Sequence, residues 1–431
     1  MPKMFSASLA LAFAFPLAAL ADTAADISAL RQEIETIRSS YEQRLQALEQ
    51  RLKAAESQAP VAPLAAVPAP VAARGGANAF NPAISLILSG TYGRTSRDPV
   101  DGAATGFALP AGSQTGRARG FSLAESELTL SANIDPWLRG QASIALHPDN
   151  TVSVEEAFVQ TTSLGKGLTL KAGRFLSGVG YMNEQHAHVW DFADAPLAYQ
   201  VFLGTQFADD GLQLRWLAPT DLFLEAGAEI GRGRSFPGSD SSRNGTGASA
   251  LFVHAGGDIG DSQSWRAGLS LLNAKPVGQT LTTTGASGGS SSTDFSGRTR
   301  VIVADAVWKW APNGNATRTN LKLQGEYLRS KRDDSPTQSG WYLQGVYQFM
   351  PRWRVGLRTE RLDSGSVADP DLLTQAVYRP RKNSLMLEFN PSEFSRLRLQ
   401  LARDRSRSGL LDNQLLLQYQ MSLGAHGAHG F

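Results

Sequence analysis

Near its C-terminus the chain reads Arg396-Leu397-Arg398-Leu399-Gln400-Leu401, in which polar residues and leucines alternate without a break. A period of two sends successive side chains to opposite faces of a β-strand, so the segment predicts a strand with one apolar and one polar face. The same alternation returns at 321–327, 352–358 and 385–389, and far upstream at 128–133. Because the strands of a soluble β-sandwich also alternate, the pattern alone leaves two fold classes open.

The lengths of the connections separate these two classes. The pattern predicts about sixteen strands, near 84–95, 120–134, 137–147, 151–163, 167–176, 208–217, 221–231, 248–258, 263–273, 299–310, 318–330, 339–349, 352–362, 382–390, 395–405 and 412–423. Every second connection is a short turn such as Asp135-Pro136 or Gly260-Asp261. Most of the others are long: 96–119, 177–207, 232–247, 274–298 and 363–381. Short turns at one end and long loops at the other are typical of outer-membrane barrels, so we predict an all-β fold, a transmembrane antiparallel β-barrel over residues 80–431.

Composition excludes several classes of protein. The 431 residues include 41 Lys+Arg, 39 Asp+Glu and no cysteine. The near-zero net charge excludes a nucleic-acid partner bound through its phosphates. The absence of cysteine excludes a disulfide scaffold, a cysteine zinc site, an Fe–S protein and a thiol nucleophile. The sequence contains no P-loop and no Ser–His arrangement of the G-x-S-x-G kind, so we expect no enzymatic activity.

The first 21 residues predict export. Residues 1–21 combine Lys3, an apolar stretch and the small-x-small pattern Ala19-Leu20-Ala21. These features are typical of a signal peptide, and the apolar run is short for a membrane span. An uncleaved anchor helix is the alternative.

Two further segments precede the predicted barrel. Residues 22–57 repeat apolar side chains at heptad spacing, beginning with Ile27 and Leu30, which predicts a short helical coiled coil in the periplasm. Isoleucine at both core positions favours three or more strands in the coil, and a single amphipathic helix packed on the chain is the alternative. Residues 58–79 are rich in proline and alanine and predict an extended linker.

Together these features resemble a Gram-negative outer-membrane porin. The chain is most similar to the coiled-coil-bearing trimeric porins of the phosphate-selective porin O/P group, on the signal peptide, the coil, the meandering strands and the terminal Phe431. The unit 390–399 (NPSEFSRLRL) is also familiar from TonB-dependent receptors. The chain departs from those receptors because it has no folded plug and is too short for their barrel.

The resemblance implies a location and partners. It implies a homotrimer in the cell outer membrane, in contact with outer-membrane lipid and assembled by the barrel-assembly machinery that reads the terminal Phe431. It implies passive diffusion of small hydrophilic solutes and no cofactor. Porins of this kind fold their third external loop into the lumen, which corresponds here to 177–207.

The polar face of each strand would line the lumen. Alternation puts basic side chains inside the later strands and acidic ones inside an early strand: Lys322, Arg352, Arg354, Arg358, Arg396, Arg398, Glu125 and Glu127. The alternation slips at Glu155 and Glu156, and Arg174 falls on the lipid face unless a bulge near the long loop shifts the register. These charges could simply solvate a polar interior. Alternatively, guanidinium groups facing carboxylates would orient solutes, with a preference for anions.

The 177–207 loop is predicted to form the constriction. It carries about ten apolar and aromatic residues, more than is expected of a loop in solvent. Folding into the channel would bury them and bring Glu184, Asp191 and Asp194 opposite the arginine-bearing strands.

The same loop contains two histidines, His186 and His188, and the tail contains His426 and His429. Imidazoles beside carboxylates can bind Zn²⁺ or Cu²⁺, although this spacing is not that of a closed site. The alternative function is therefore zinc or copper uptake through this loop, coupled to energy through TonB. A structural or adhesion barrel tethered by its coil is a third class.

Overall fold

The computed structural model describes residues 82–98, 104–110, 113, 119–241, 244–372 and 374–424. The predicted signal peptide (1–21), coiled coil (22–57) and linker (58–79) lie outside the described residues. Phe431, His426 and His429 lie outside them as well. The expectations attached to these segments therefore stay predictions.

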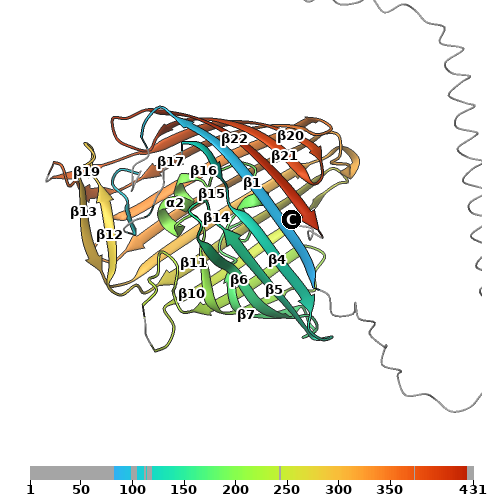
Figure 1. Cartoon of the computed structure of the whole chain (residues 1–431). Helices are drawn as coiled ribbons and strands as arrows, with labels where there is room; N and C mark the ends of the chain where they lie inside the picture. Colours follow the sequence, from blue (N-terminus) through green and yellow to red (C-terminus); the bar gives the residue numbers. More distant parts are fainter. Residues whose placement is uncertain are drawn as a thin grey trace, which may run out of the picture. The chain divides into compact units, whose positions relative to one another are not determined.

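Antiparallel strands form a closed barrel (Figure 1). Its sheet has 17 strands, but β3 and β4 follow one another along the same neighbour, β1, so the barrel has 16 positions. The barrel closes where β1 pairs with β22, with Ser85 opposite Gly424 and Thr95 opposite Gln414. The barrel strands are β1 (Ala83–Thr95), β3 (Gly120–Leu123), β4 (Ser126–Asn133), β5 (Leu138–Leu146), β6 (Val152–Thr161), β7 (Leu168–Leu176), β8 (Ala208–Leu217), β9 (Phe223–Gly231), β10 (Ala248–Ile259), β11 (Gln263–Ala274), β14 (Thr299–Trp310), β15 (Asn320–Arg332), β16 (Thr337–Met350), β17 (Trp353–Asp363), β20 (Arg381–Ser392), β21 (Ser395–Arg405) and β22 (Asp412–Gly424).

The barrel confirms the predicted fold class, including the count of 16 strand positions. Each predicted strand end lies within two residues of an observed one. The strand predicted at 120–134 is interrupted at Ala124 and Glu125, between β3 and β4. There the backbone N–H of Ala124 still donates to the carbonyl of Ser89 at 2.9 Å, while the N–H of Ser89 donates to the side-chain hydroxyl of Ser126 at 3.1 Å, so a side-chain bond replaces part of the main-chain ladder.

The long loops carry the remaining elements. One loop sheet consists of β2 (Ala108–Pro110), β12 (Gln279–Thr284) and β13 (Ser290–Phe295), and a hairpin consists of β18 (Ser366–Ala368) and β19 (Gln375–Val377). The helical elements are η1 (Ala187–Val189), α2 (Leu197–Leu203) and η2 (Pro312–Gly314). In the part of the chain that the structure describes, no helix has the length and apolar character to cross a membrane.

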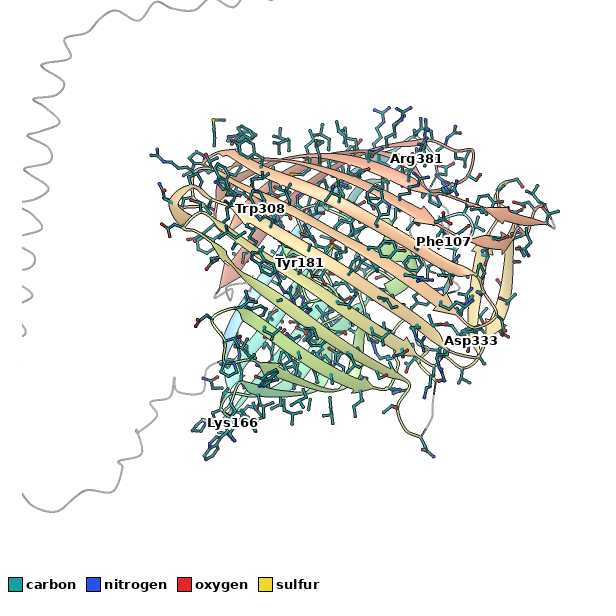
Figure 2. All side chains as sticks on the ribbon, turned by 180° about the vertical axis from the view of Figure 1, so that it is seen from behind. Phe107, Lys166, Tyr181, Trp308, Asp333 and Arg381 are labelled. Carbon is teal, nitrogen blue, oxygen red and sulfur yellow. The ribbon has the colours of Figure 1, made fainter. Side chains whose placement is uncertain are left out.

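The two faces of the barrel wall differ in chemistry. Along β14, buried Val301, Val303 and Asp305 alternate with exposed Ile302 and Ala304. Exposed leucines continue this outer face on the neighbouring strands. Tyr327 on β15 lies opposite Trp341 on β16, and the Trp353 and Phe389 rings are 4.7 Å apart near the other end. Trp308 lies towards the short-turn end and Asp333 at the long-loop end (Figure 2). The outer face is therefore apolar with aromatic side chains near both ends, as lipid contact requires.

Candidate functional site

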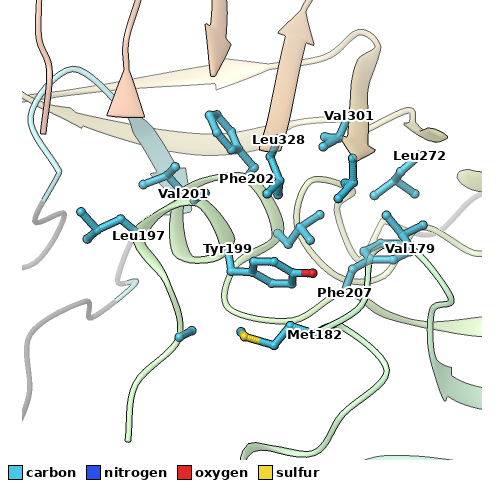
Figure 3. Packing of buried hydrophobic residues seen from close by; sticks show 14 of the residues in the cluster. Val179, Met182, Leu197, Tyr199, Val201, Phe202, Phe207, Leu272, Val301 and Leu328 are labelled. Atoms are coloured by element: carbon cyan, nitrogen blue, oxygen red, sulfur yellow. The ribbon is translucent and has the colours of Figure 1, made fainter. Parts of the chain in front are cut away.

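The loop 177–207 lies inside the barrel. Its helix α2 packs on β15, β16 and β17 and buries Leu197, Val201 and Phe202 against wall residues that include Leu328 (Figure 3). Apolar side chains gain free energy when they leave water, which explains why this loop folds inward. The side chain of Asn183 closes the neck of the loop, because its amide donates to the carbonyls of Ser177 and Phe207 at 2.8 and 2.9 Å.

Three wall glutamates hold the loop by its backbone. Glu229 on β9 accepts the N–H of Gly178 at 2.8 Å, and Glu360 on β17 accepts the N–H of Leu197 at 2.6 Å. Glu326 on β15 accepts the N–H of Met182 at 3.0 Å and the hydroxyls of Tyr199 and Tyr342 at 2.7 and 2.6 Å. Gly180 lies so close to Glu326 that a Cβ would be 2.6 Å from its carboxylate oxygen. The loop therefore has defined attachment points on three strands.

We call one inner surface the basic wall. It consists of cations that strands β15 to β21 point inward: Lys322, Arg354, Arg358, Lys382, Arg396 and Arg398. Asp191 of the loop binds Lys322 at 3.0 Å and Arg354 at 2.5 Å. Asp194 binds Arg358 at 2.7 Å and Lys382 at 2.6 Å. The loop thus supplies two carboxylates to four cations of this wall.

The basic wall has an internal carboxylate as well. Glu388 on β20 binds Arg354 and Arg398, each at 2.8 Å. Arg398 also donates to the carbonyl of Trp190 in the loop at 2.7 Å. The buried cations are therefore paired and hydrogen-bonded, as burial of a charge requires.

The electrostatics of Asp191 follow from its partners. Burial alone would raise its pKa, but Lys322 and Arg354 outweigh burial and hold the pKa of Asp191 below its usual value of 3.8. The carboxylate is therefore ionised at neutral pH.

Glu184 corrects the sequence-based expectation. It was expected opposite the same arginine-bearing strands, but it contacts Arg215 on β8 and lies 3.6 Å from Arg266 on β11. The reason is its place in the loop, because Glu184 precedes the segment that reaches the basic wall. Sequence analysis named neither arginine.

We call the facing surface the acidic wall. It consists of Glu125 and Glu127 beside or within β4 and of Glu155 and Glu156 on β6. A β-bulge explains the slip in alternation. Ser143 pairs with Glu156 and Ile144 pairs with Val154, so Glu155 has no ladder partner. Both glutamates of β6 then reach the interior.

The bulge lies in β6, whereas the outward position of Arg174 had predicted a bulge near the long loop that follows β7. Arg174 stays on the outer face by alternation, where it binds Asp210 at 2.6 Å. A paired arginine near the long-loop end costs less than an isolated charge facing lipid.

The loop histidines meet the acidic wall. His186 Nδ1 lies 3.1 Å from Glu127 and 3.2 Å from Glu155, and its Nε2 lies 3.1 Å from Glu156. His188 Nδ1 lies 3.0 Å from Glu127, and the two imidazoles stack with centroids 5.6 Å apart. Burial alone would lower the pKa of His186, but the adjacent carboxylates outweigh it and raise this pKa well above 6.5.

A cavity remains at the short-turn end, with a volume of about 330 Å³. His188 and Val189 of the loop and Arg396 and Gln420 of the wall are among its lining residues. The Arg396 guanidinium donates to the Gln420 side chain at 2.6 Å.

Sequence reasoning missed two inner glutamates: Glu326, which holds the loop, and Glu388, which pairs with arginines of the basic wall. Glu326 lies in the alternating run 321–327, and Glu388 lies in the run 385–389. The same period of two that placed Lys322 and Arg398 inside also places these carboxylates inside. Applying the alternation to acidic side chains of the later strands would have found them.

Comparisons with known proteins place this geometry among outer-membrane proteins by fold. No known family model matches the chain. A loop L8 deletion mutant of OmpT, an outer membrane protein of Vibrio cholerae, superposes with a TM-score of 0.53 and 10% identity over 80% of this chain and 99% of that one. An anion-selective porin from Comamonas acidovorans gives a TM-score of 0.51 and 12% identity over 80% of this chain and 99% of that one. At such low identity the likeness shows the fold alone.

A closer relative is found by sequence. An uncharacterized protein of Aquifex aeolicus (strain VF5) is 31% identical over 397 residues, which cover 82% of this chain and 80% of that protein. The chain therefore belongs to the same protein family as this Aquifex aeolicus protein.

Proposed function

We propose that the protein is an outer-membrane, porin-like channel through which small hydrophilic solutes diffuse passively. One observation carries the proposal: a closed barrel has an apolar outer face and a charged inner face, and a loop lies between two inner walls of opposite charge. An apolar exterior suits lipid, and a charged, narrowed interior suits selective passage of polar solutes. Loop 177–207 is the proposed constriction.

We infer a preference for anions from the exposure of the cations. The side chains of Lys322, Arg354 and Arg396 are 17%, 21% and 13% exposed, whereas that of Arg398 is 1% exposed. Of these, Arg396 lines the cavity of about 330 Å³ described above, and a partly exposed cation there raises the local concentration of anions. The anion-selective porin of Comamonas acidovorans, which shares the fold, supports this inference.

Planar-bilayer recording tests the channel. Purified full-length protein should give discrete single-channel openings, and its reversal potential in a KCl gradient should indicate preference for chloride. Replacing the lumen cation in Arg396→Ala should reduce that preference. The matched control is Arg300→Ala, which removes an exposed arginine on the outer face of β14. Folded protein that never conducts would overturn the proposal, and equal selectivity of the two variants would overturn the role of Arg396.

We infer that the long-loop end faces the outer leaflet. Arg361, Arg381 and Arg405 lie directly opposite one another on β17, β20 and β21, and Figure 2 shows Arg381 near the long-loop end. Like charges in this arrangement repel, and no ion pair is found for these three within the described residues. They line a cavity of about 500 Å³ together with Arg379 and Arg407. Lipid phosphates would neutralise such a row.

The orientation can be tested by labelling, because the chain has no cysteine. Ser287 lies in a long loop and Ala316 at the opposite, short-turn end, and both are exposed. A membrane-impermeant maleimide should label Ser287→Cys but not Ala316→Cys in intact cells. If Ala316→Cys is labelled and Ser287→Cys is not, the proposed orientation is wrong. If neither variant is labelled in intact cells, the long-loop end is not exposed at the cell surface.

We also propose export by residues 1–21 and trimer formation through the coil at 22–57. The support is the sequence pattern described above. Cross-linking should give a trimer for the full chain and mostly monomer after removal of 22–57. A trimer of equal yield without the coil would contradict this role for the coil.

A further inference from the structure

We propose that loop 177–207 and the acidic wall form a binding site for a divalent transition-metal ion such as Zn²⁺, with Glu127, Glu155 and His186 as ligands. Their ligand atoms lie within 4.8 Å of one another. They come from β4, from the bulge in β6 and from the loop just before η1. The inference goes beyond the proposed channel and does not depend on it, because metal binding can be measured without any conductance.

One carboxylate oxygen of the cluster lacks a hydrogen bond within the part of the chain that the structure describes. Glu127 is 3% exposed, and its Oε2 has no hydrogen-bond partner among the described residues. The Nδ1 atoms of His186 and His188 lie 3.1 and 3.0 Å from it, but without the direction that a hydrogen bond requires. Leaving a buried carboxylate oxygen unbonded is costly, so the geometry points to an additional positive partner.

Neighbouring side chains orient the imidazole of His186. The Nε2 atom of His186 lies 3.1 Å from Glu156. Glu156 is itself held by the N–H of Leu176 at 3.0 Å and by Gln141 at 3.2 Å. A carboxylate that binds one imidazole nitrogen fixes the tautomer and leaves the other nitrogen free to coordinate a metal. Here that other nitrogen is Nδ1, which bonds Glu155 at 3.2 Å and would give up its proton when the ion binds.

Similar support exists for Glu127. Its Oε1 accepts the hydroxyl of Thr129 at 2.6 Å, and this hydroxyl lies 3.1 Å from that of Ser143. One carboxylate oxygen is thus tied to the barrel wall, and the other points towards the histidines. Fixed ligands of this kind lower the entropic cost of binding an ion.

The charge of the cluster and the chemistry of its ligand atoms favour a transition-metal ion. Three carboxylates, those of Glu127, Glu155 and Glu156, lie within 3.2 Å of the two loop imidazoles, and their other partners, such as Thr129 and Gln141, are uncharged. A divalent ion would offset the excess negative charge. A nitrogen ligand combined with carboxylate oxygens favours Zn²⁺ or Cu²⁺ over Ca²⁺ and Mg²⁺, which prefer oxygen alone. The bound ion would join the loop to the acidic wall.

Calorimetry with ZnCl₂ on chelator-treated, detergent-purified full-length protein tests the site. To remove binding by the tail, the background chain carries His426→Ala and His429→Ala. This chain should bind one Zn²⁺, and His186→Gln or Glu127→Gln should abolish binding. The orienting variant Glu156→Gln should weaken binding by about 10- to 100-fold. His147→Ala, a histidine that bonds Ser153 outside the cluster, is the matched control and should bind as the background chain does.

Folding of each variant is checked by the shift in gel mobility between heated and unheated samples. As a second measurement, Co²⁺ added to the background chain should give the visible absorption of a nitrogen- and oxygen-ligated ion, which Zn²⁺ then removes. Absence of Zn²⁺ binding by the background chain overturns the proposal. Zn²⁺ binding of unchanged affinity in folded His186→Gln, or in folded Glu127→Gln, overturns it as well.

Discussion

The basic wall and the acidic wall hold the same loop in different ways. On the basic wall, five cations each have a carboxylate within 3.0 Å. On the acidic wall, three carboxylates share two imidazoles, and one buried oxygen of Glu127 is left without a hydrogen bond within the described residues. The sixth cation of the basic wall, Arg396, is the exception there, because it lies 3.7 Å from Glu388 and its buried Nε has no hydrogen bond within the described residues. The basic wall is therefore paired at five of its six cations and positions the loop, whereas the acidic wall has more carboxylates than imidazoles and can bind something further.

The ion pairs on the basic wall serve mainly to position the loop 177–207. Buried ion pairs give up hydration, so their net contribution to stability is small, whereas removal of one partner is strongly destabilising. The apolar packing of α2 supplies the driving force for folding inward, and the ion pairs select where the loop rests. The following tests separate the two walls, from the largest expected effect to the smallest.

Removing the segment that contacts both walls should have the largest effect. Residues 184–195 are replaced by a short Gly/Ser linker, while Asn183 and α2 are kept. Because this segment carries the contacts to both walls, single-channel conductance should rise severalfold. Unchanged conductance in a folded variant would show that the segment does not narrow the channel.

Glu388→Gln should remove the ion pairs within the basic wall and destabilise the folded protein. It leaves Arg398 buried without its carboxylate, at a cost of about 3–5 kcal/mol in the free energy of unfolding. Urea titration in detergent measures this free energy. Glu393→Gln, an exposed glutamate in the next turn, is the control and should change it little. A loss for Glu388→Gln no larger than that of the control would contradict the pairing described above.

The pH dependence of Asp191 should give the smallest effect. Its folded pKa lies below 3.8, so its stabilising contribution is fully present above the unfolded pKa and is lost as pH falls through the folded value. The difference in unfolding free energy between wild type and Asp191→Asn should therefore be constant from pH 7 to about pH 5 and shrink below about pH 4. If the difference in unfolding free energy already shrinks between pH 7 and about pH 5, the titrating group is not Asp191.

Much of the barrel could be predicted because its signals are local. The alternation at 321–327 and at 396–401 put Lys322 and Arg398 on the inner face, where the structure has them. Turn residues between alternating runs gave strand ends to within two residues. The site was harder to predict from the sequence, because Arg354 and Asp191, which bind each other, are 163 residues apart in the chain.

Glu184 and Arg174 show where local reasoning stops. Glu184 was assigned to the wrong wall, and Arg174 was given a bulge that lies in the neighbouring strand. Both errors concern the path of the backbone rather than the chemistry of a residue. A bulge changes which face a side chain occupies, and a period of two cannot indicate on which of two adjacent strands the extra residue lies.

By itself the sequence determined the barrel, its strand number and the inner face of the strands that alternate cleanly, because alternation and turn chemistry act between residues close in the chain. Only the tertiary structure decided that Asp191 and Asp194 meet the basic wall, that Glu184 meets Arg215, and that His186 meets Glu127. The reason is physical: the loop crosses the interior along the path that buries α2, and the packing of distant strands defines that path.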